Sequence, residues 1–128
     1  MSSILYKAKV YPEILLKRIT VNAYTRIGNK QVGTMLIVEN DDCWEITMNK
    51  LFQSQLLGKG IGYLMLQTAI EKLREIGVKK IRVRPKVERD YENKISEEKL
   101  ISLYERQGFV KDKITDASGK NYYVMTIN

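Results

Sequence analysis

The sequence of 128 residues contains no histidine, a single cysteine and only two prolines. The absence of histidine excludes nucleophilic or general-base chemistry that depends on an imidazole. We expect no metal site of the zinc type, because one cysteine cannot assemble the usual ligand set. Cys43 also cannot form an internal disulfide, which favours a reducing, cytosolic setting.

Long apolar runs are also absent. No window approaches the roughly eighteen consecutive apolar residues of a membrane span, and the N-terminus lacks the basic-then-apolar order of a signal peptide. We therefore expect a cytoplasmic protein without membrane contact. Hydrophobic residues make up 44% and charged residues 29% of the chain, a composition typical of globular domains. The length predicts one domain over residues 1–128.

The charge balance is basic, with a formal net charge of +7. Such a charge can serve solubility alone. It can also attract an anionic partner, namely coenzyme A, nucleic acid or an acidic acceptor. Lysine and arginine are distributed along most of the chain rather than gathered in one tail, so both interpretations stay open.

Hydrophobic periodicity predicts an α/β protein. Alternation predicts strands over residues 4–12, 19–26, 31–39, 43–52, 80–85, 109–114 and 122–127. Helical spacing predicts one helix over residues 61–76, with Ile76 on its apolar stripe, and another that begins near Ser96 and stops at Gly108. The order is strands, helix, strand, helix and a final hairpin, which indicates a mixed sheet.

A glycine-rich stretch joins the fourth strand to the first helix, with Gly58, Gly60 and Gly62 between larger residues. Glycine permits positive φ and close approach of a ligand to the backbone. A helix start carries unpaired N–H groups at the positive end of the dipole, so the turn can hold phosphate. The spacing fits neither the P-loop nor the dinucleotide fingerprint. A merely structural tight turn is an equally good interpretation of this motif alone.

Two segments together carry a family resemblance. Residues 58–66 resemble the acetyl-CoA pyrophosphate loop and following helix of the GNAT-type N-acetyltransferases. Residues 103–109, Leu-Tyr-Glu-Arg-Gln-Gly-Phe, are similar to the family's second signature. The resemblance covers residues 43–110 well. It implies the GNAT fold, with a mixed, mostly antiparallel sheet and two main helices. The two helices that usually follow the first strand are expected to be reduced or absent, because about a dozen residues remain for them.

The resemblance implies acetyl-CoA as the acyl donor, and no metal. A backbone N–H at Leu51 or Phe52 would polarise the thioester carbonyl, and the pantetheine amides would pair with the strand near Phe52 and Gln53. Leu57 stands where the family usually has glutamine or arginine, which departs from the pattern. The phosphates would be held by main-chain N–H groups, with one lysine adding charge, in the run Gly58, Lys59, Gly60, Ile61, Gly62 and Tyr63.

Two side chains are candidates for catalysis. By resemblance, Tyr104 would give a proton to the departing thiolate. Glu45 lies near the usual place for a group that deprotonates the amine, directly or through water. From the residues alone, Tyr104 also fits a packing role on an amphipathic helix, and Glu45 an exposed position on a strand.

The first functional interpretation is an N-acetyltransferase that transfers an acetyl group directly to an amine. Loss of the two helices would open the acceptor side, which suits a protein or peptide. The alternative is a weak or inactive GNAT-fold protein with a binding or regulatory role, because Leu57 and Glu97 replace usual cofactor contacts. Nucleic-acid binding is not favoured, since the basic stretch 79–86 has no interleaved aromatic residues. An exposed strand end at the C-terminus would allow a homodimer.

Overall fold

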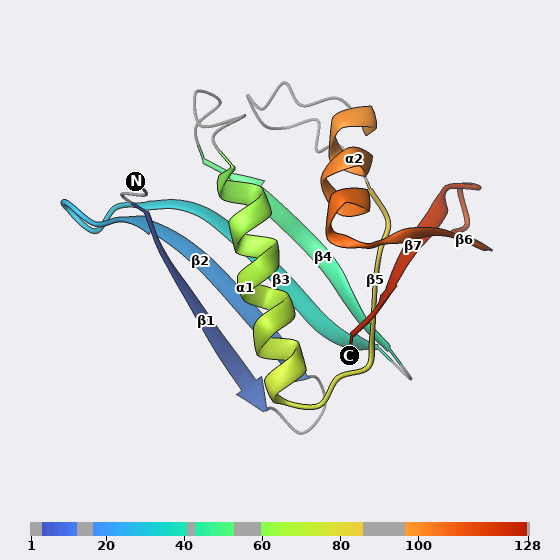
Figure 1. Cartoon of the computed structure of the whole chain (residues 1–128), viewed down its shortest axis with the longest axis horizontal. Coiled ribbons are helices and arrows are strands. Elements are labelled where there is room, and N and C mark those ends of the chain that lie inside the picture. The colour runs from blue at the N-terminus through green and yellow to red at the C-terminus, as the bar shows by residue number, and fades with distance from the viewer. Residues whose placement is uncertain (1–3, 13–16, 41–42, 53–59, 86–96, 128) are drawn as a thin grey trace.

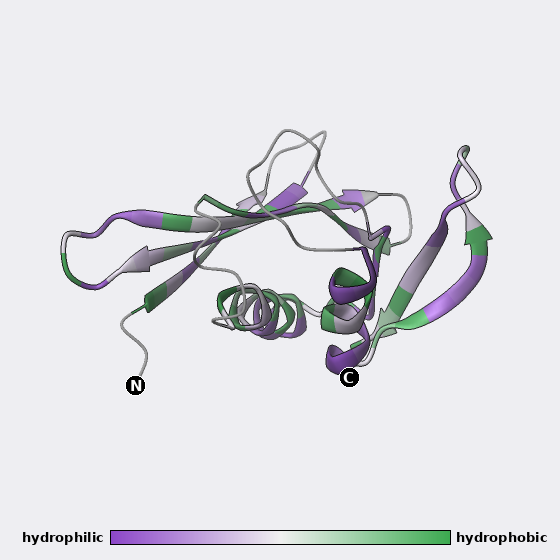
Figure 2. Ribbon diagram, turned by 90° about the horizontal axis from the view of Figure 1, so that it is seen from above, coloured by the Kyte–Doolittle hydropathy of each residue, from purple (hydrophilic) through white to green (hydrophobic). Residues whose placement is uncertain are grey.

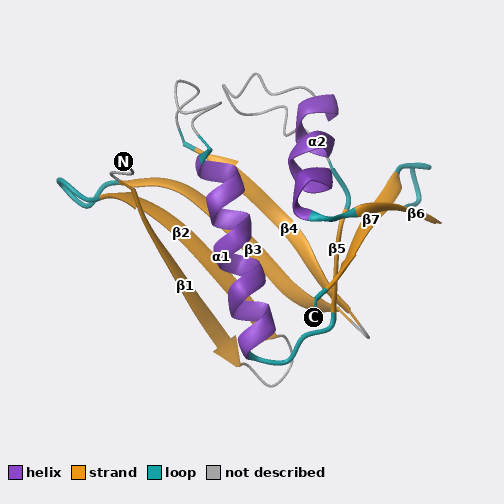
Figure 3. Cartoon of the chain, in the orientation of Figure 1, coloured by secondary structure: helices purple, strands orange, loops and turns teal. Residues whose placement is uncertain are grey.

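The computed structural model describes residues 4–12, 17–40, 43–52, 60–85 and 97–127. These residues form seven strands and two helices (Figure 1, Figure 3). Neither described helix has the length and apolar character needed to cross a membrane. In chain order, the elements are β1 Ile4–Pro12, β2 Lys17–Thr25, β3 Gln31–Asn40, β4 Cys43–Leu51, α1 Ile61–Glu75, β5 Lys80–Val83, α2 Glu97–Gln107, β6 Val110–Thr115 and β7 Asn121–Thr126.

The strands form one sheet in the order β1-β2-β3-β4-β5-β7-β6. All neighbours are antiparallel except β4 and β5, which are parallel. The predicted mixed, mostly antiparallel sheet with two helices is therefore confirmed. The C-terminal strand β7 is paired on both sides, so the expectation of an exposed strand end there was wrong. Among the described strands, β6 forms that edge.

The connection between β1 and β2 is short. Only residues 13–16, which lie outside the described residues, separate the two strands. β1 and β2 pair directly along their whole length, from Ile4 opposite Thr25 to Pro12 opposite Lys17. Two helices cannot fit into four residues, which confirms that the usual first pair of GNAT helices is missing from this chain.

Both helices lie on the same face of the sheet (Figure 2). The strands turn fully buried side chains toward them, including Ile19, Val21, Met35 and Ile37. Helix α1 contributes Met65, Leu66, Ala69, Ile70 and Leu73 to this core. The prediction that Ile76 joins the stripe was wrong, because α1 ends at Glu75 and Ile76 is 43% exposed. Gly77 follows with φ 84° and turns the chain toward β5.

Strands β4 and β5 stay paired over only three residues each, and the last pair is Ile46 with Val83. Strand β5 ends there, whereas β4 continues beside β3 as far as Leu51. The β3–β4 register shifts at this same level, where Thr47 is the extra residue of a bulge. The two parallel strands therefore part in the middle of the sheet, and the space between them is where the site lies.

Candidate active site

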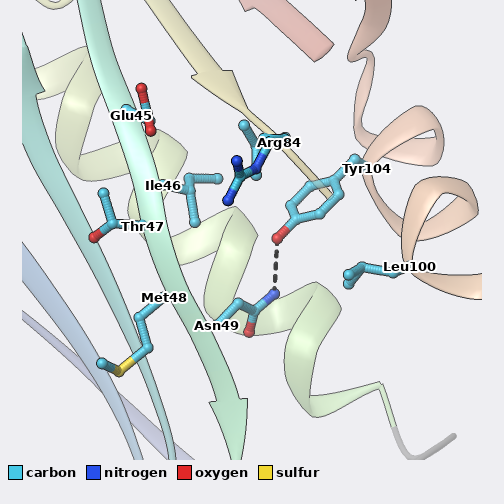
Figure 4. Close-up of a pocket in the computed structure, with 9 residues that line it drawn as sticks. Glu45, Ile46, Thr47, Met48, Asn49, Arg84, Leu100 and Tyr104 are labelled. Carbon is cyan, nitrogen blue, oxygen red and sulfur yellow. Dashed lines mark hydrogen bonds between the residues drawn. The ribbon is translucent and has the colours of Figure 1, made fainter. Parts of the chain in front are cut away.

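A pocket of about 350 Å³ occupies the gap where β4 and β5 part, and α2 forms its far side. In Figure 4 the side chain of Tyr104 extends from α2 toward β4, and Arg84 points into the same space from the end of β5. The lining residues are Glu45, Ile46, Thr47, Met48, Asn49, Val83, Arg84, Leu100 and Tyr104.

The end of α2 explains how Tyr104 is held. Gly108 adopts φ 112°, and the amides of Gly108 and Phe109 donate to the carbonyls of Glu105 and Tyr104 at 3.0 and 3.1 Å. This double bond pattern is a Schellman cap, which places the residue after the glycine against the last turn of the helix. The Phe109 ring meets the Tyr104 ring edge-on, with centroids 5.4 Å apart. The glycine and phenylalanine of the signature Tyr-x-x-x-Gly-Phe thus fix the position of the tyrosine side chain.

The Tyr104 hydroxyl reaches the pocket, although only 2% of the residue is exposed. Asn49 Nδ2 donates a hydrogen bond of 3.2 Å to its oxygen (Figure 4). Burial raises the pKa of Tyr104 to about 12, while the Asn49 hydrogen bond acts in the opposite direction. The phenol therefore stays protonated at neutral pH. Because its oxygen accepts from Asn49, its own hydrogen is left to be donated to a group in the pocket.

Glu45 lies at the rim of the same pocket and is bound to a cation. Arg82 Nε donates to Glu45 Oε1 at 2.7 Å, with the two side chains 28% and 19% exposed. Burial disfavours the charged form of Arg82, yet the hydrogen bond and charge of Glu45 outweigh it and raise the pKa of Arg82. The structure thus brings Glu45 to the site and gives it a structural partner as well.

Arg84, which belongs to the basic stretch 79–86, lines the pocket. Its guanidinium pairs with the carboxylate of Asp116, in the turn between β6 and β7. Hydrogen bonds from Ser118, the Arg84 pair and backbone hydrogen bonds from Lys120 and Ser118 hold the pKa of Asp116 well below its usual range. The β6–β7 turn is thereby fastened to the pocket wall.

The N-terminus of α1 has the features expected of an anion site. Gly60 is the N-cap residue at φ 80°, no side chain caps the helix, and no acidic residue lies in its first turn. Arg106 of α2 lies over the Tyr63 ring, 5.7 Å from the centroid, and so adds a cation beside this turn. Gln107 Nε2 donates to the Tyr63 carbonyl at 3.3 Å, which ties the two helices together. The predicted loop residues Gly58 and Lys59 lie outside the described residues.

The backbone of β4 separates the two candidate amides. The Phe52 N–H donates to the Val32 carbonyl on β3 at 3.0 Å. Successive amides of a strand point to opposite sides, so the Leu51 amide points toward the side on which β5 lies. This geometry favours Leu51 over Phe52 for contact with a carbonyl in the gap. Gln53 lies outside the described residues.

The sequence motifs do not indicate Asn49, Arg84 or Arg106 as candidate site residues. Asn49 and Tyr104 are 55 residues apart in the sequence, so no local pattern links them. Arg106 lies inside the second signature at a variable position. Of the three, only Asn49 has a feature that points to the site. It is a polar residue of β4, the strand that continues past its parallel neighbour β5.

The sequence model of the acetyltransferase (GNAT) family matches residues 11–109. The chain belongs to the GNAT acetyltransferase family. The match contains both signature segments and the strands between which the pocket opens. No curated protein matches this sequence.

Solved structures share the GNAT fold with this chain. A domain from Methanocaldococcus jannaschii has TM-score 0.67 and 25% identity, and the match covers 85% of this chain and 66% of that one. PaiA N-acetyltransferase from Thermoplasma acidophilum, solved with coenzyme A, has TM-score 0.65 and 17% identity, with coverages of 85% and 60%. The ribosomal-protein-S18-alanine N-acetyltransferase of Escherichia coli has TM-score 0.63 and 15% identity, with coverages of 87% and 70%. The chain thus spans about two thirds of these proteins.

Proposed function

We propose that this protein is an acetyl-CoA-dependent N-acetyltransferase that transfers an acetyl group directly to an amine on a protein or peptide. The observation that carries the proposal is the Tyr104 hydroxyl, held by Asn49 in a pocket between the two parallel strands. Acetyl-CoA would supply the acetyl group as a thioester. Family membership, rather than the fold alone, supports this choice of donor.

The phosphates are assigned to the first turn of α1, with Gly58, Lys59, Gly60, Ile61, Gly62 and Tyr63 as the cofactor-binding run. Among the described residues, no atom lies within 4 Å of a Cβ built on Gly60. A Cβ built on Gly62 would lie 3.7 Å from Leu103 Cδ2, next to Tyr104 in the sequence. This proximity supports assigning the phosphate site and the proton donor to the same side of the sheet.

Each of three residues is assigned one step of the acetyl transfer. The Leu51 amide donates to the carbonyl oxygen, which gains negative charge as the amine nitrogen bonds to carbon. Glu45 takes the proton that the amine loses, directly or through water. The carbon–sulfur bond then breaks, and Tyr104 gives its proton to sulfur. Phe52 and Gln53 stay assigned to the pantetheine arm.

The missing helices support a large acceptor. In this chain β1 passes directly to β2, and no described element covers the sheet face opposite α1 and α2. Among the described residues, the sheet itself and the β6–β7 turn bound the acceptor side of the pocket. The Escherichia coli relative in fold acts, by its name, on an alanine of a ribosomal protein. A screen in which only small free amines are acetylated would contradict the proposed acceptor class.

Binding of the donor is tested by calorimetric titration with acetyl-CoA. We expect micromolar binding by the wild type and none by Gly60→Trp, whose indole would fill the space before α1. Gly28→Trp is the matched control, because Gly28 has φ 81° and equally open surroundings in the β2–β3 turn. Loss of binding in both variants, or in neither, would contradict the assigned phosphate site.

Catalysis is tested with Tyr104→Phe. We expect acetyl-CoA binding to persist while kcat falls by about 10²-fold or more, the usual contribution of a positioned acid. Glu45→Gln should lower kcat/KM, because the amide cannot accept the proton that the amine loses. Tight binding of acetyl-CoA by the wild type without turnover on any protein or peptide amine would select the non-enzymatic alternative instead.

A further inference from the structure

The sheet face opposite the two helices, here called the open face, is rich in cations and aromatic rings. No element among the described residues covers it (Figure 2). Directly opposed residues of neighbouring strands share a face. Lys7, Lys9 and Tyr11 of β1 therefore lie on the same side as their neighbours on β2, with Tyr11 opposite Arg18. The alternate residues of β1 pack into the core instead.

The rings and cations of β1 and β2 are in direct contact. Lys7 Nζ lies 5.0 Å from the Tyr24 ring centroid. Lys9 Nζ and the Arg18 guanidinium lie 4.9 and 4.7 Å from the Tyr11 centroid. Each ring therefore has positive charge beside its π-surface. Tyr11 is six positions after Leu5, and Leu5 is opposite Tyr24. The Tyr11 and Tyr24 rings therefore lie about 20 Å apart along the strands.

Cation–π contacts also occur farther along the sheet from β1, on strands β4, β5 and β7. Arg82 of β5 lies 4.7 Å from the Tyr122 ring centroid on β7, and Lys50 of β4 lies 5.2 Å from the ring centroid of Phe52, which directly follows β4. Val124, two residues from Tyr122, is opposite Arg82, which places both on the open face. Aromatic rings with adjacent cations thus occur from β1 to β7.

The open face carries a strong excess of positive charge. On the described strands β1 to β5, the alternation leaves one carboxylate on this face, Glu45, and that group already pairs with Arg82. Lys7 and Lys9 are exposed on the edge strand. The complementary partner is therefore an anion, and a second copy of this face would be repelled.

We infer that the open face binds single-stranded nucleic acid, with phosphates on Lys7, Lys9 and Arg18 and bases against Tyr11, Tyr24 and Tyr122. Lysine is depleted in protein–protein interfaces but is a common phosphate contact. Aromatic rings on a sheet surface can accept unstacked bases, and Tyr11, Tyr24 and Tyr122 are each partly exposed. The basic stretch 79–86 lacks aromatic residues in sequence, but the fold supplies Tyr122 beside Arg82 from a distant strand.

The inference is tested by fluorescence anisotropy with a labelled oligothymidylate of about twenty nucleotides. We expect micromolar binding by the full chain at about 50 mM salt that weakens linearly on a log–log plot. Lys7→Gln with Lys9→Gln should lower affinity about tenfold and reduce the salt slope by about 1.4, the contribution of two phosphates on a single strand. Lys72→Gln with Lys99→Gln, which removes the same charge from the helices, should change neither.

Tyr24→Leu tests the bases, because it keeps the charge and much of the apolar bulk. We expect at least about a fivefold loss of affinity with an unchanged salt slope, and an unchanged circular dichroism spectrum. Poly-L-glutamate should compete weakly, and saturating coenzyme A should not compete. Equal competition by poly-L-glutamate would show that the open face binds acidic proteins. Displacement by coenzyme A would place the oligonucleotide in the donor site. An equal loss of affinity in the Lys72/Lys99 variant would show that binding depends only on the net charge of the protein. Each of these results overturns the inference, and none bears on acetyl transfer.

Discussion

The two faces of the sheet are built from alternate residues of the same strands, yet they are used differently. On the helix-covered face, Ile19, Val21, Met35 and Ile37 are fully buried. On the open face, the intervening positions hold tyrosines, lysines and arginines in ion pairs and cation–π contacts. The difference shows that one face supplies the hydrophobic stability of this short chain, which leaves the other face available for recognition.

The comparison is sharpest at neighbouring residues of β3. Met35 is fully buried under α1, whereas Leu36 is only partly buried on the open face. We expect Met35→Ala to lower the free energy of unfolding by about 2–5 kcal/mol, because it leaves a cavity as well as losing buried area. Leu36→Ala should cost about 1 kcal/mol or less. Urea denaturation of both variants measures the difference, and equal losses would show that the open face is also a core.

A smaller effect distinguishes the buried tyrosine of the covered side. Because burial raises the pKa of Tyr104 to about 12, the unfolded chain loses the phenolic proton near pH 10 while the folded chain retains it. Stability should therefore fall as pH rises between about 10 and 12, by about 1.4 kcal/mol at pH 11 from this group alone. The Tyr104→Phe variant should lack the part of this pH-dependent loss of stability that Tyr104 causes. An identical pH dependence in both proteins would contradict the buried, protonated phenol.

The smallest expected effect lies on the open face. The Glu45–Arg82 pair is partly exposed, so a double-mutant cycle with Glu45→Ala and Arg82→Ala should give a coupling of about 0.5–1 kcal/mol. Added salt should reduce this coupling while leaving the Met35→Ala effect nearly unchanged. A coupling of several kcal/mol would mean that the pair is buried by a covering segment.

Local sequence patterns predicted most elements of the fold. Period-two alternation predicted the strand over residues 19–26, and its alternate residues Ile19, Val21 and Ala23 are fully buried in β2. Glycine marked the end of α2 at Gly108, where φ is positive. Ile76 shows the limit of periodicity, because its spacing fits the apolar stripe but the helix has already ended.

Long-range pairing could not be predicted. The order β5-β7-β6 places β7 inside the sheet, and neither strand contains a local signal for that insertion. For the same reason, the hydrogen bond from Asn49 to Tyr104 and the contact of Arg82 with Tyr122 were missed. The motifs indicated residue types for the proposed donor site, whereas only the fold shows which side chains line the pocket between β4 and β5.

The position of β6 at the sheet edge has a consequence for aggregation. Val110 and Ile114 are 66% and 59% exposed there, and no other described strand pairs with the outer side of β6. Lys111 and Lys113 alternate with them, and the register with β7 shifts between Lys111 and Thr115. Charged residues and irregular register on an edge strand oppose its addition to another sheet. These two lysines therefore oppose the pairing of this apolar edge strand with a strand of another molecule.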